Sequence, residues 1–521
     1  MNRTPKRRLS RRATLDSHAA ETALSLVLAM FSRLMMHYLI ARTRAAHSCC
    51  CTCRVLSCNG RLEPRARTSR SVASRGRRGA LTVLHLMVAA SCAAVLLLTA
   101  ASASADSRKR DVPNYTGLRE TTSAGDALIW IPRIALSPLY LVSEYGVRRP
   151  LGFLISEAER AKLPQFLYSL FFFGPDREAA LLPVAFVDFG FYPSVGLYFF
   201  WKDELRIRAA RWGADWLSGS ISGRLKIAPD TALVLHATGT RRPEYRYFGV
   251  GADSRRADAT RYGASRYEVG AKLELKLGGL SIFSVDMGFR RVHFHRGEGF
   301  DGDPRLDDQI ARGRVSAPAG YVAGYGLLYN RVALVLDSRA PRPASQSGVR
   351  FELQGELMSR VLPRAAASFA RYGATAGASW DIGHTGRVLS FAVSALFVDP
   401  VQGGEAVPFT ELAALGGDDR MRGFQPGRLF GRSSAVVSLR YRWPIAVWLD
   451  GSLQLAAGNV FDAQLRDLSP NRLRLSGAIG VESTGAPDSS LEILLGAGTE
   501  TFAQGTQISS VRAIVGTNHG F

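Results

Sequence analysis

The chain has 521 residues and a formal net charge of +22, from 66 Lys and Arg against 44 Asp and Glu. Residues 1–78 hold 17 of these basic residues and 3 of the acidic ones, and residues 79–105 hold neither kind, so residues 106–521 have a net charge of only +8. Most of the positive net charge therefore lies in the N-terminal segment, and it does not indicate a nucleic-acid-binding protein.

The N-terminal segment, residues 1–78, also carries most of the cysteines. Their order, Cys-Cys-Cys-x-Cys, lacks the paired spacing of a zinc site, and only His47 lies nearby. We interpret residues 1–78 as an extension upstream of the true translation start, with metal binding as the alternative. Residues 106–521 contain no cysteine, which excludes disulfides and thiol chemistry there. The cysteines of the segment are Cys49, Cys50, Cys51, Cys53 and Cys58.

Residues 79–105 have the pattern of a secretory signal peptide. Arginines at 75, 77 and 78 precede an uncharged apolar run over residues 80–100, and Ala103-Ser-Ala105 follows. We expect cleavage after Ala105. The alternative is a single transmembrane helix, because the run approaches spanning length. Cys92 does not indicate a lipoprotein signal, since the apolar run continues past it.

Residues 106–182 have helical rather than strand character. Helical spacing covers Ala127–Val147 and Ser156–Phe173, and Ser156-Glu-Ala-Glu159 fits a capping box at the start of the second stretch. Prolines interrupt the first stretch. The sequence predicts short apolar helices that lie on the inner leaflet or plug a barrel, or else a small packed periplasmic subdomain.

Residues 183–521 read as one strand after another, with tight turns alternating with long polar loops such as 296–320 and 400–432. Aromatic residues fall near the strand ends, as in the interfacial girdles of membrane barrels. We predict an all-β fold, a transmembrane antiparallel barrel of about sixteen strands, preceded by the helical segment. The predicted strands are Val184–Phe191, Ser194–Trp201, Leu205–Trp212, Ser220–Ile227, Thr231–Thr238, Tyr267–Leu277, Leu280–Phe294, Tyr321–Leu336, Val349–Met358, Ala374–Trp380, Val388–Val398, Ala435–Trp443, Leu453–Val460, Leu473–Val481, Leu491–Thr499 and Ile508–Val515.

The final strand ends on Gly520 and Phe521. A barrel must pair its last strand with its first, and an aromatic at that point lies at the membrane interface, so we interpret this pair as a barrel-closing signal. Gly516 and Asn518 precede it. Glycine weakens strand order, so the sequence predicts a weak seam there; glycines that merely accommodate closure are the alternative.

Enzymatic function is not indicated. Residues 106–521 contain neither a Gly-x-Ser-x-Gly elbow nor a phosphate-binding loop. His293 and His295 alternate on one predicted strand, where an interfacial pair is favoured over a metal site. We therefore predict no catalytic residue, no metal and no cofactor.

Several segments resemble motifs of the bacterial surface antigen family, the BamA/TamA-like outer-membrane assembly factors. The signature loop of that family corresponds to Val407–Phe424, which ends on Met421, Arg422, Gly423 and Phe424. The matching segments occur in the order of the family and cover roughly residues 183–521. They are Tyr247–Ser254, Leu334–Arg339, Val407–Phe424, Ala435–Pro444, Gly458–Phe461 and Gly520–Phe521.

The resemblance implies that the loop folds into the barrel lumen, where Arg422 pairs with an acidic group of the wall. An ordinary solvated arginine is the alternative. Two positions where the family has carboxylates carry Arg440 and Ala456 instead. The remaining candidates for the partner are Asp418, Asp419 and Glu411, and Arg428 of the same loop is expected to matter less than Arg422. These departures predict a weakened ion pair.

The resemblance also implies a function and a location. We expect a protein of the Gram-negative outer membrane that inserts or translocates proteins or lipids, with outer-membrane lipids and client outer-membrane proteins as partners and no nucleic acid. The alternative is a passive pore or surface antigen with the same barrel and no assembly activity. Residues 106–182 do not show the periplasmic repeat (POTRA) pattern of strands and helices, so the chain looks similar to the branch without these domains.

Overall fold

The computed structural model describes residue 145 and residues 169–517, apart from 341–345, 363–367, 385, 402–405, 418–419, 447–448 and 484–490. The predictions for residues 1–78, for the signal peptide, for Gly520 and Phe521 and for most of the helical segment therefore lie outside the described residues. Within the described ranges, no helix is long and apolar enough to cross a membrane.

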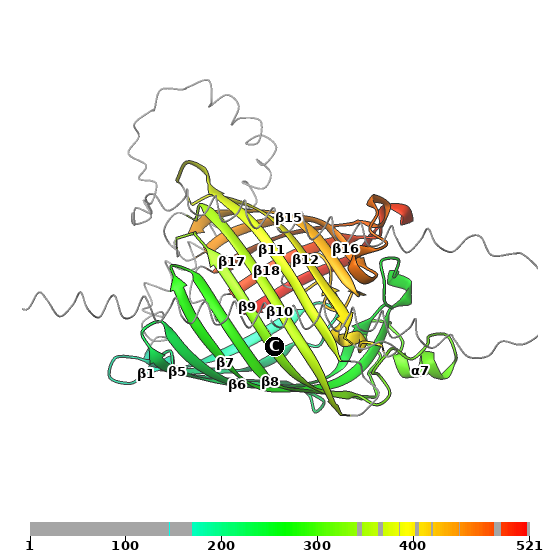
Figure 1. Ribbon diagram of the computed structural model, residues 1–521, viewed down its shortest axis with the longest axis horizontal. Helices are drawn as coiled ribbons and strands as arrows, with labels where there is room; N and C mark the ends of the chain where they lie inside the picture. The colour runs from blue at the N-terminus through cyan, green and yellow to red at the C-terminus, as the bar shows by residue number, and fades with distance from the viewer. Residues whose placement is uncertain are drawn as a thin grey trace, which may run out of the picture. The chain divides into compact units, whose positions relative to one another are not determined.

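Sixteen of the described strands pair antiparallel with their neighbours and close into a barrel (Figure 1). All sixteen overlap the predicted strands, which confirms the predicted fold class. The barrel strands are β2 (Ala179–Asp188), β3 (Ser194–Trp201), β4 (Leu205–Trp212), β5 (Trp216–Ala228), β6 (Thr231–Tyr247), β7 (Thr260–Gly278), β8 (Ser281–His295), β9 (Tyr325–Asp337), β10 (Gly348–Leu362), β11 (Phe369–Asp381), β12 (Val388–Pro400), β15 (Ser433–Ala446), β16 (Leu449–Phe461), β17 (Arg474–Ser483), β18 (Leu491–Thr499) and β19 (Ile508–Thr517).

The remaining described elements are short. The two-residue strand β1 (Phe172–Phe173) pairs with β2, and β13 (Ala413–Leu415) and β14 (Leu429–Gly431) form a hairpin of their own. The α-helix α7 (Leu306–Ala311) lies in the loop between β8 and β9. The 3-10 turns are η2 (Arg256–Asp258), η3 (Ile382–His384), η4 (Phe409–Glu411), η5 (Ala463–Leu465), η6 (Pro470–Arg472) and η7 (Phe502–Gln504).

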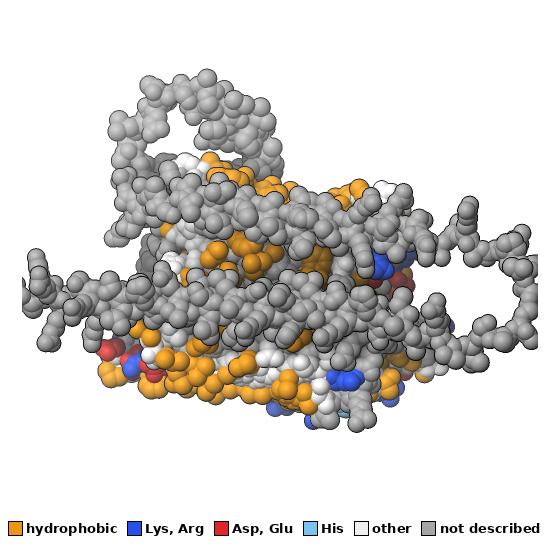
Figure 2. Space-filling model, in the orientation of Figure 1, with side chains coloured by type: hydrophobic (Ala, Val, Ile, Leu, Met, Phe, Trp, Pro, Cys, Tyr) orange, Lys and Arg blue, Asp and Glu red, His pale blue; other side chains and the backbone are white. Residues whose placement is uncertain are grey.

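Exposed apolar side chains alternate with buried side chains along the strands, so the barrel has an apolar outer surface and a polar interior. On β18, Ile493 and Leu495 are 43% and 59% exposed, whereas Glu492 and Leu494, which alternate with them, are buried. Strand side chains alternate between the two faces of a sheet, so the exposed set faces outward and the buried set faces the lumen. Hydrophobic side chains gather over the outward face of the strands (Figure 2). Such a surface suits hydrocarbon as its solvent.

The two ends of the barrel differ in their connections. At one end, here called the turn end, residues 202–204 join β3 to β4 and residues 279–280 join β7 to β8. At the other end, the loop end, residues 248–259 and 296–324 form long connections, and the segment from 401 to 432 contains the β13–β14 hairpin. In outer-membrane barrels the short turns face the periplasm and the long loops face the exterior.

The start of the barrel differs from the prediction. The first barrel strand is Ala179–Asp188 rather than Val184–Phe191, because Gly190 has a left-handed φ of +91° and turns the chain toward β3. The predicted helix Ser156–Phe173 is wrong at its end, where Phe172 and Phe173 form β1. Gly174, with φ +97°, reverses the chain so that these two residues lie beside Ala179 and Ala180.

Candidate functional site: the lumen loop and the seam

The loop between β12 and β15 folds back into the lumen. Its β13–β14 hairpin and the Met421–Phe424 motif contribute buried apolar side chains that pack against the inner wall. On the wall, the contacts come from β15 and β16. This apolar cluster comprises Leu415, Met421, Phe424, Leu429, Val436, Ala456 and Val460. The position of Ala456, where the family has a carboxylate, is therefore part of an apolar contact.

Arg422 pairs with Glu492 of β18, and both side chains are almost fully buried. The sequence missed this partner, which is neither at position 440 nor at position 456. Arg440 does not face Arg422 as an unpaired cation, since its own Nη2 donates to Glu482 at 2.6 Å. Glu411 binds other residues, described below, and Asp418 and Asp419 lie outside the described residues.

The motif touches the wall through glycines on both sides of the contact. The Gly423 N–H donates to Ser476 Oγ at 2.9 Å. A Cβ at Gly423 would lie 2.0 Å from the Ala497 carbonyl oxygen, and one at Gly498 would lie 2.5 Å from the Phe424 ring. Both positions therefore require glycine, because the loop backbone and an aromatic ring press directly on β18.

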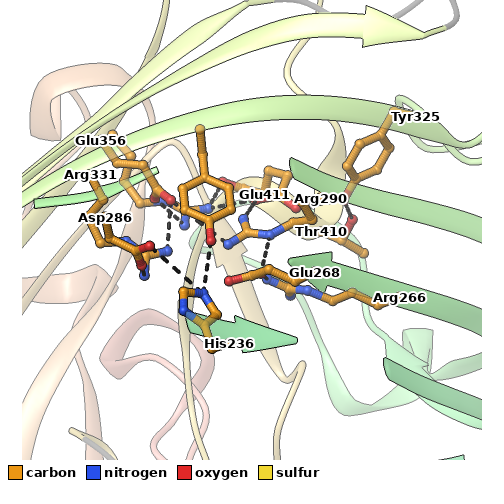
Figure 3. Close-up of polar contacts among 12 residues, drawn as sticks. His236, Arg266, Glu268, Asp286, Arg290, Tyr325, Arg331, Glu356, Thr410 and Glu411 are labelled. Atoms are coloured by element: carbon orange, nitrogen blue, oxygen red, sulfur yellow. Dashed lines mark hydrogen bonds and ion pairs between the residues drawn. The ribbon is translucent and has the colours of Figure 1, made fainter. Parts of the chain in front are cut away.

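A second anchor ties the same loop to the other side of the lumen (Figure 3). Glu411 accepts bonds from Arg290 Nη1 of β8 and from the Tyr325 hydroxyl of β9, both at 2.8 Å, and from Arg371 Nη2 of β11 at 3.2 Å. Burial would raise the pKa of Glu411, but Arg290, Arg266 and Arg371 outweigh it and lower the pKa to about 2.

The Glu411 anchor belongs to a larger ionic network on the wall (Figure 3). Arg290 Nε donates to Glu268 at 2.7 Å, and Arg331 binds both Glu356 and Asp286. In the ring of sixteen strands, β9 and β18 are seven strands apart in one direction and nine in the other. Glu411 and Arg422 therefore fasten one loop to nearly opposite walls.

A third anchor holds the loop at the loop end of the barrel. Arg428 donates to Ser254 Oγ at 3.0 Å and to Glu500 at 3.1 Å, and its guanidinium stacks on Phe248. Burial and the neighbouring Arg474 lower the pKa of Arg428 to about 10. Arg428 is thus as buried as Arg422. Its contacts give no reason for Arg428 to contribute less than Arg422 to the folded barrel.

Segments singled out in the sequence meet at this third anchor. Arg474 binds Glu500 and donates to the carbonyls of Ala252 and Ser254, while Asn459 donates to Ala252 O at 3.1 Å. Ala252 and Ser254 belong to the motif Tyr247–Ser254, and Asn459 belongs to the motif Gly458–Phe461. Asn459 of one motif therefore binds a backbone carbonyl of the other motif, 207 residues away, and Arg474 binds the same carbonyl.

Within the described residues, which end at Thr517, the seam between the last and first barrel strands has a short ladder. β19 pairs with β2 at three positions, Ile514 with Asp188, Val515 with Val187 and Gly516 with Phe186. By contrast, β18 and β19 pair at nine positions. A buried ion pair, Arg512 Nη2 to Asp188 at 2.9 Å, crosses the seam.

Gly516 lies inside this ladder, where a Cβ would meet the Ala185 carbonyl oxygen at 2.7 Å. A side chain at position 516 would collide with the β2 backbone. This is the arrangement expected if the glycine accommodates closure of the barrel. Asn518 lies outside the described residues. The weak seam that the sequence predicts from Gly516 and Asn518 stays a prediction, because residues 518–521 lie outside the described residues.

The histidines and the lumen cavity form no metal cluster among the described residues. His295 Nδ1 contacts the Arg296 carbonyl, and His236 lies 3.1 Å from the Tyr329 hydroxyl. A cavity of about 390 Å³ is lined by residues of β4 to β9 and of the turn before β4, with charges of both signs that include Arg224, Glu274 and Asp286. The mixture of charges indicates a hydrated lumen.

Comparisons with known proteins add a match to a known domain. Residues 249–497 match the Omp85 superfamily domain. A search of curated proteins found no match.

Solved structures similar to the chain include other membrane barrels. BamA from Haemophilus ducreyi lacking POTRA domains 1–3 is 15% identical with a TM-score of 0.44, over 65% of this chain and 70% of that one. CdiB from Acinetobacter baumannii is 10% identical with a TM-score of 0.40, and the match spans 65% of this chain and 59% of that one. The CymD monoaromatic hydrocarbon channel is 10% identical with a TM-score of 0.28, over 65% and 85% of the two chains.

No POTRA repeat is evident in the described part of the chain. The match covers the strands that form most of the wall, the lumen loop and its anchors Arg422, Glu411 and Arg428. Residues 249–497 therefore match the Omp85 superfamily domain, and the barrel that contains them lies in the outer membrane of a Gram-negative bacterium.

Proposed function

We propose that this barrel inserts or translocates proteins or lipids at the outer membrane, and that it does so by opening between β19 and β2. The observation that carries the proposal is the seam ladder, which among the described residues has three residue pairs, against nine between β18 and β19. An opened seam exposes unpaired N–H and C=O groups, on which a strand of a client protein can form by β-augmentation.

The three loop anchors support this function. Arg422, Glu411 and Arg428 fix the loop to the wall on both sides of the lumen. A wall braced from inside at β8, β9, β11 and β18 keeps its shape while the short ladder separates. The partners of this activity are outer-membrane lipids and client outer-membrane proteins, and the chain acts without enzymatic chemistry.

A disulfide across the seam tests the proposal. Val515 and Val187 lie opposite each other, and residues 106–521 contain no cysteine of their own. The double variant Val515→Cys/Val187→Cys, oxidised, should lose function, seen as slow growth, a leaky envelope and lower outer-membrane levels of other barrels. Reduction should restore all three.

The matched control places the disulfide inside a longer ladder. Val481 and Ile493 are opposite each other on β17 and β18, so Val481→Cys/Ile493→Cys should oxidise without loss of function. If the seam-locked barrel supports growth and envelope integrity as well as the control does, the assembly function is wrong and a passive pore or surface antigen stands in its place.

A further inference from the structure

The outward face of β7 shows where the apolar surface of the barrel ends. Alternate residues from Val269 to Leu277 face outward, and all of them are apolar. They span nine residues, and a barrel strand crosses the hydrocarbon in about 9–11 residues. The next outward residue toward the loop end is Tyr267, which is 53% exposed. Tyr267 therefore lies at the outer interface of the membrane, where tyrosine is enriched.

Arg291 of β8 lies directly opposite Tyr267. Its strand neighbours, Arg290 and Val292, are buried on the lumen side, so the Arg291 side chain faces outward, where it is exposed. Opposite residues on adjacent antiparallel strands have Cβ atoms about 4.5–5.5 Å apart. Arg291 and Tyr267 are therefore neighbours at the outer interface.

The two consecutive arginines of β8 differ in their partners. Arg290 donates to Glu268 Oε2 at 2.7 Å and to Glu411 Oε2 at 2.8 Å. Among the described residues, the Arg291 guanidinium forms neither an ion pair nor a hydrogen bond. The arginine that faces the lumen is thus satisfied by the protein, whereas the arginine that faces the membrane is available to an outside partner.

His293 adds a second polar group to the same face. It lies two residues beyond Arg291, it is exposed, and its side chain has no hydrogen bond in the described part of the chain. Arg241 of β6, in the same ladder row as His293, is not available, because it binds Asp215 at 3.2 Å. On β9 the residue opposite Arg291 is Gly326, which has no side chain that could bind the guanidinium.

An apolar surface adjoins Arg291 on the side toward the centre of the bilayer. One row of the ladder places Val269, Phe289 and Leu328 side by side on three strands. Val269 and Leu328 are 54% and 48% exposed. A molecule that binds Arg291 at the interface can therefore place hydrocarbon chains along this surface.

The unpaired cation determines which kind of molecule fits. A charge on the lipid face of a barrel is most unfavourable at the middle of the bilayer and least unfavourable near its interface, so Arg291 lies at the level of the lipid headgroups. The anion at that level is a headgroup phosphate, whose oxygens a guanidinium can bind with two parallel N–H donors. The Tyr267 hydroxyl and the His293 ring supply further donors.

We propose that Tyr267, Arg291 and His293 form a binding site for the phosphate of an anionic lipid in the outer leaflet. The acyl chains of this lipid lie along the apolar row that contains Phe289. The occupant is a lipid rather than a free anion, because the cation and the apolar surface adjoin. This assignment rests on the location of the barrel in the outer membrane, and it holds for a passive barrel as well as for an assembly factor.

Lipid binding to the purified full-length protein tests the site. The probe is diphosphoryl lipid A, added to the protein in micelles of an uncharged detergent, and bound lipid is measured by native mass spectrometry. Arg291→Ala should weaken binding by about tenfold, as expected for the loss of a charge-assisted hydrogen bond. Arg291→Lys keeps the charge but loses the planar fork, so its affinity should lie between the two. Equal affinity of the parent and Arg291→Ala would overturn the proposal.

Two further probes separate the lipid from its parts. Lipid A without its phosphates should bind the parent about tenfold more weakly than the diphosphoryl form, for the same reason. Inorganic phosphate at an equal concentration of phosphate should not displace the bound lipid. Equal binding of the dephosphorylated lipid would mean that only the apolar surface binds, and displacement by inorganic phosphate would mean a site for a soluble anion. Either result would overturn the headgroup site.

The controls separate lipid binding from folding. Because Arg291 has no partner among the described residues, Arg291→Ala should keep the heat-modifiable migration and the urea midpoint of the parent in the uncharged detergent. Arg466→Ala removes the same charge from an exposed arginine that pairs with Asp462, and it should bind the lipid as the parent does. A lower urea midpoint for Arg291→Ala would show that this arginine stabilises the protein itself. That result, or an equal loss of lipid binding in Arg466→Ala, would refute the site.

Discussion

Arg422 and Glu492 are 70 residues apart in the sequence and form an ion pair inside the barrel, with side chains 3% and 2% exposed. One partner belongs to the loop and the other to the wall, so the pair joins an element that could move to one that is held by ladders on both sides. Removing either side chain takes a buried charge partner from the other, and breaking a buried ion pair in this way costs roughly 3–5 kcal/mol.

The first prediction concerns this pair. Arg422→Ala and Glu492→Ala should each lower the yield of folded barrel. Each should also lower the free energy of unfolding of the purified protein by about 3 kcal/mol, which is measured as a lower urea midpoint. This is a larger effect than the sequence indicated, because the carboxylate missing at positions 440 and 456 is supplied by Glu492. The double variant Arg422→Leu/Glu492→Leu should recover much of the loss, because no charge remains buried. Arg466→Ala, at an exposed surface arginine, is the control and should behave as the parent. A single variant with the parent midpoint would show that the pair contributes nothing.

The second prediction concerns Arg428. Arg428→Ala should be about as harmful to folded yield as Arg422→Ala, because it takes one of two guanidinium partners from Glu500, leaves Arg474 as the other, and removes the stacking on Phe248. Arg428→Lys should restore little, since a lysine cannot bind Ser254 and Glu500 at once in the planar geometry of a guanidinium. The measurement is the fraction of heat-modifiable protein in outer membranes. Full yield for Arg428→Ala would mean that the loop is held without its third anchor.

The third prediction is a pH dependence from Glu411. Its pKa is lowered to about 2 from the ordinary value of 4.5, so the folded state binds this proton less readily than the unfolded state does. The corresponding stability is present above pH about 4.5 and is lost as the pH falls toward 2, by about 3 kcal/mol over that range. Urea midpoints measured between pH 7 and pH 2.5 should show this fall.

The control for the pH prediction is Glu411→Gln, which cannot titrate. Its stability should be lower at pH 7 and should change less between pH 5 and pH 2.5 than that of the parent. Parallel curves for the two proteins would place the acid sensitivity elsewhere, for example at Asp303 or Glu500, whose pKa values are also lowered by surrounding arginines although burial opposes the shift.

The fourth prediction concerns the barrel as a whole. A closed barrel satisfies its backbone hydrogen bonds internally, so it should resist SDS until it is boiled. An unheated sample should migrate differently from a boiled one on a gel. The seam-locked variant Val515→Cys/Val187→Cys, oxidised, should need a higher temperature for the shift than the reduced form. Identical migration of heated and unheated parent would count against the closed barrel.

The sequence by itself determined the sixteen strands and the separation of outside from inside. A strand in a membrane barrel must alternate between lipid and lumen, and this requirement is local, so it is visible in segments such as Ser194–Trp201 and Leu205–Trp212, whose predicted and observed bounds agree. The Met421–Phe424 motif was also visible, because its residues are consecutive in the chain.

Only the tertiary structure decided which charges meet. Glu492 lies on a strand whose local pattern is that of any barrel strand, and it reaches Arg422 because the loop folds back across the lumen. Arg428 reaches Ser254 and Glu500 for the same reason. The pairings of β1 and of β19 with β2 depend on how the two ends of the sheet meet when the barrel closes. Local patterning sets the face on which a side chain lies, whereas ring closure and the path of one long loop set its partner across the lumen.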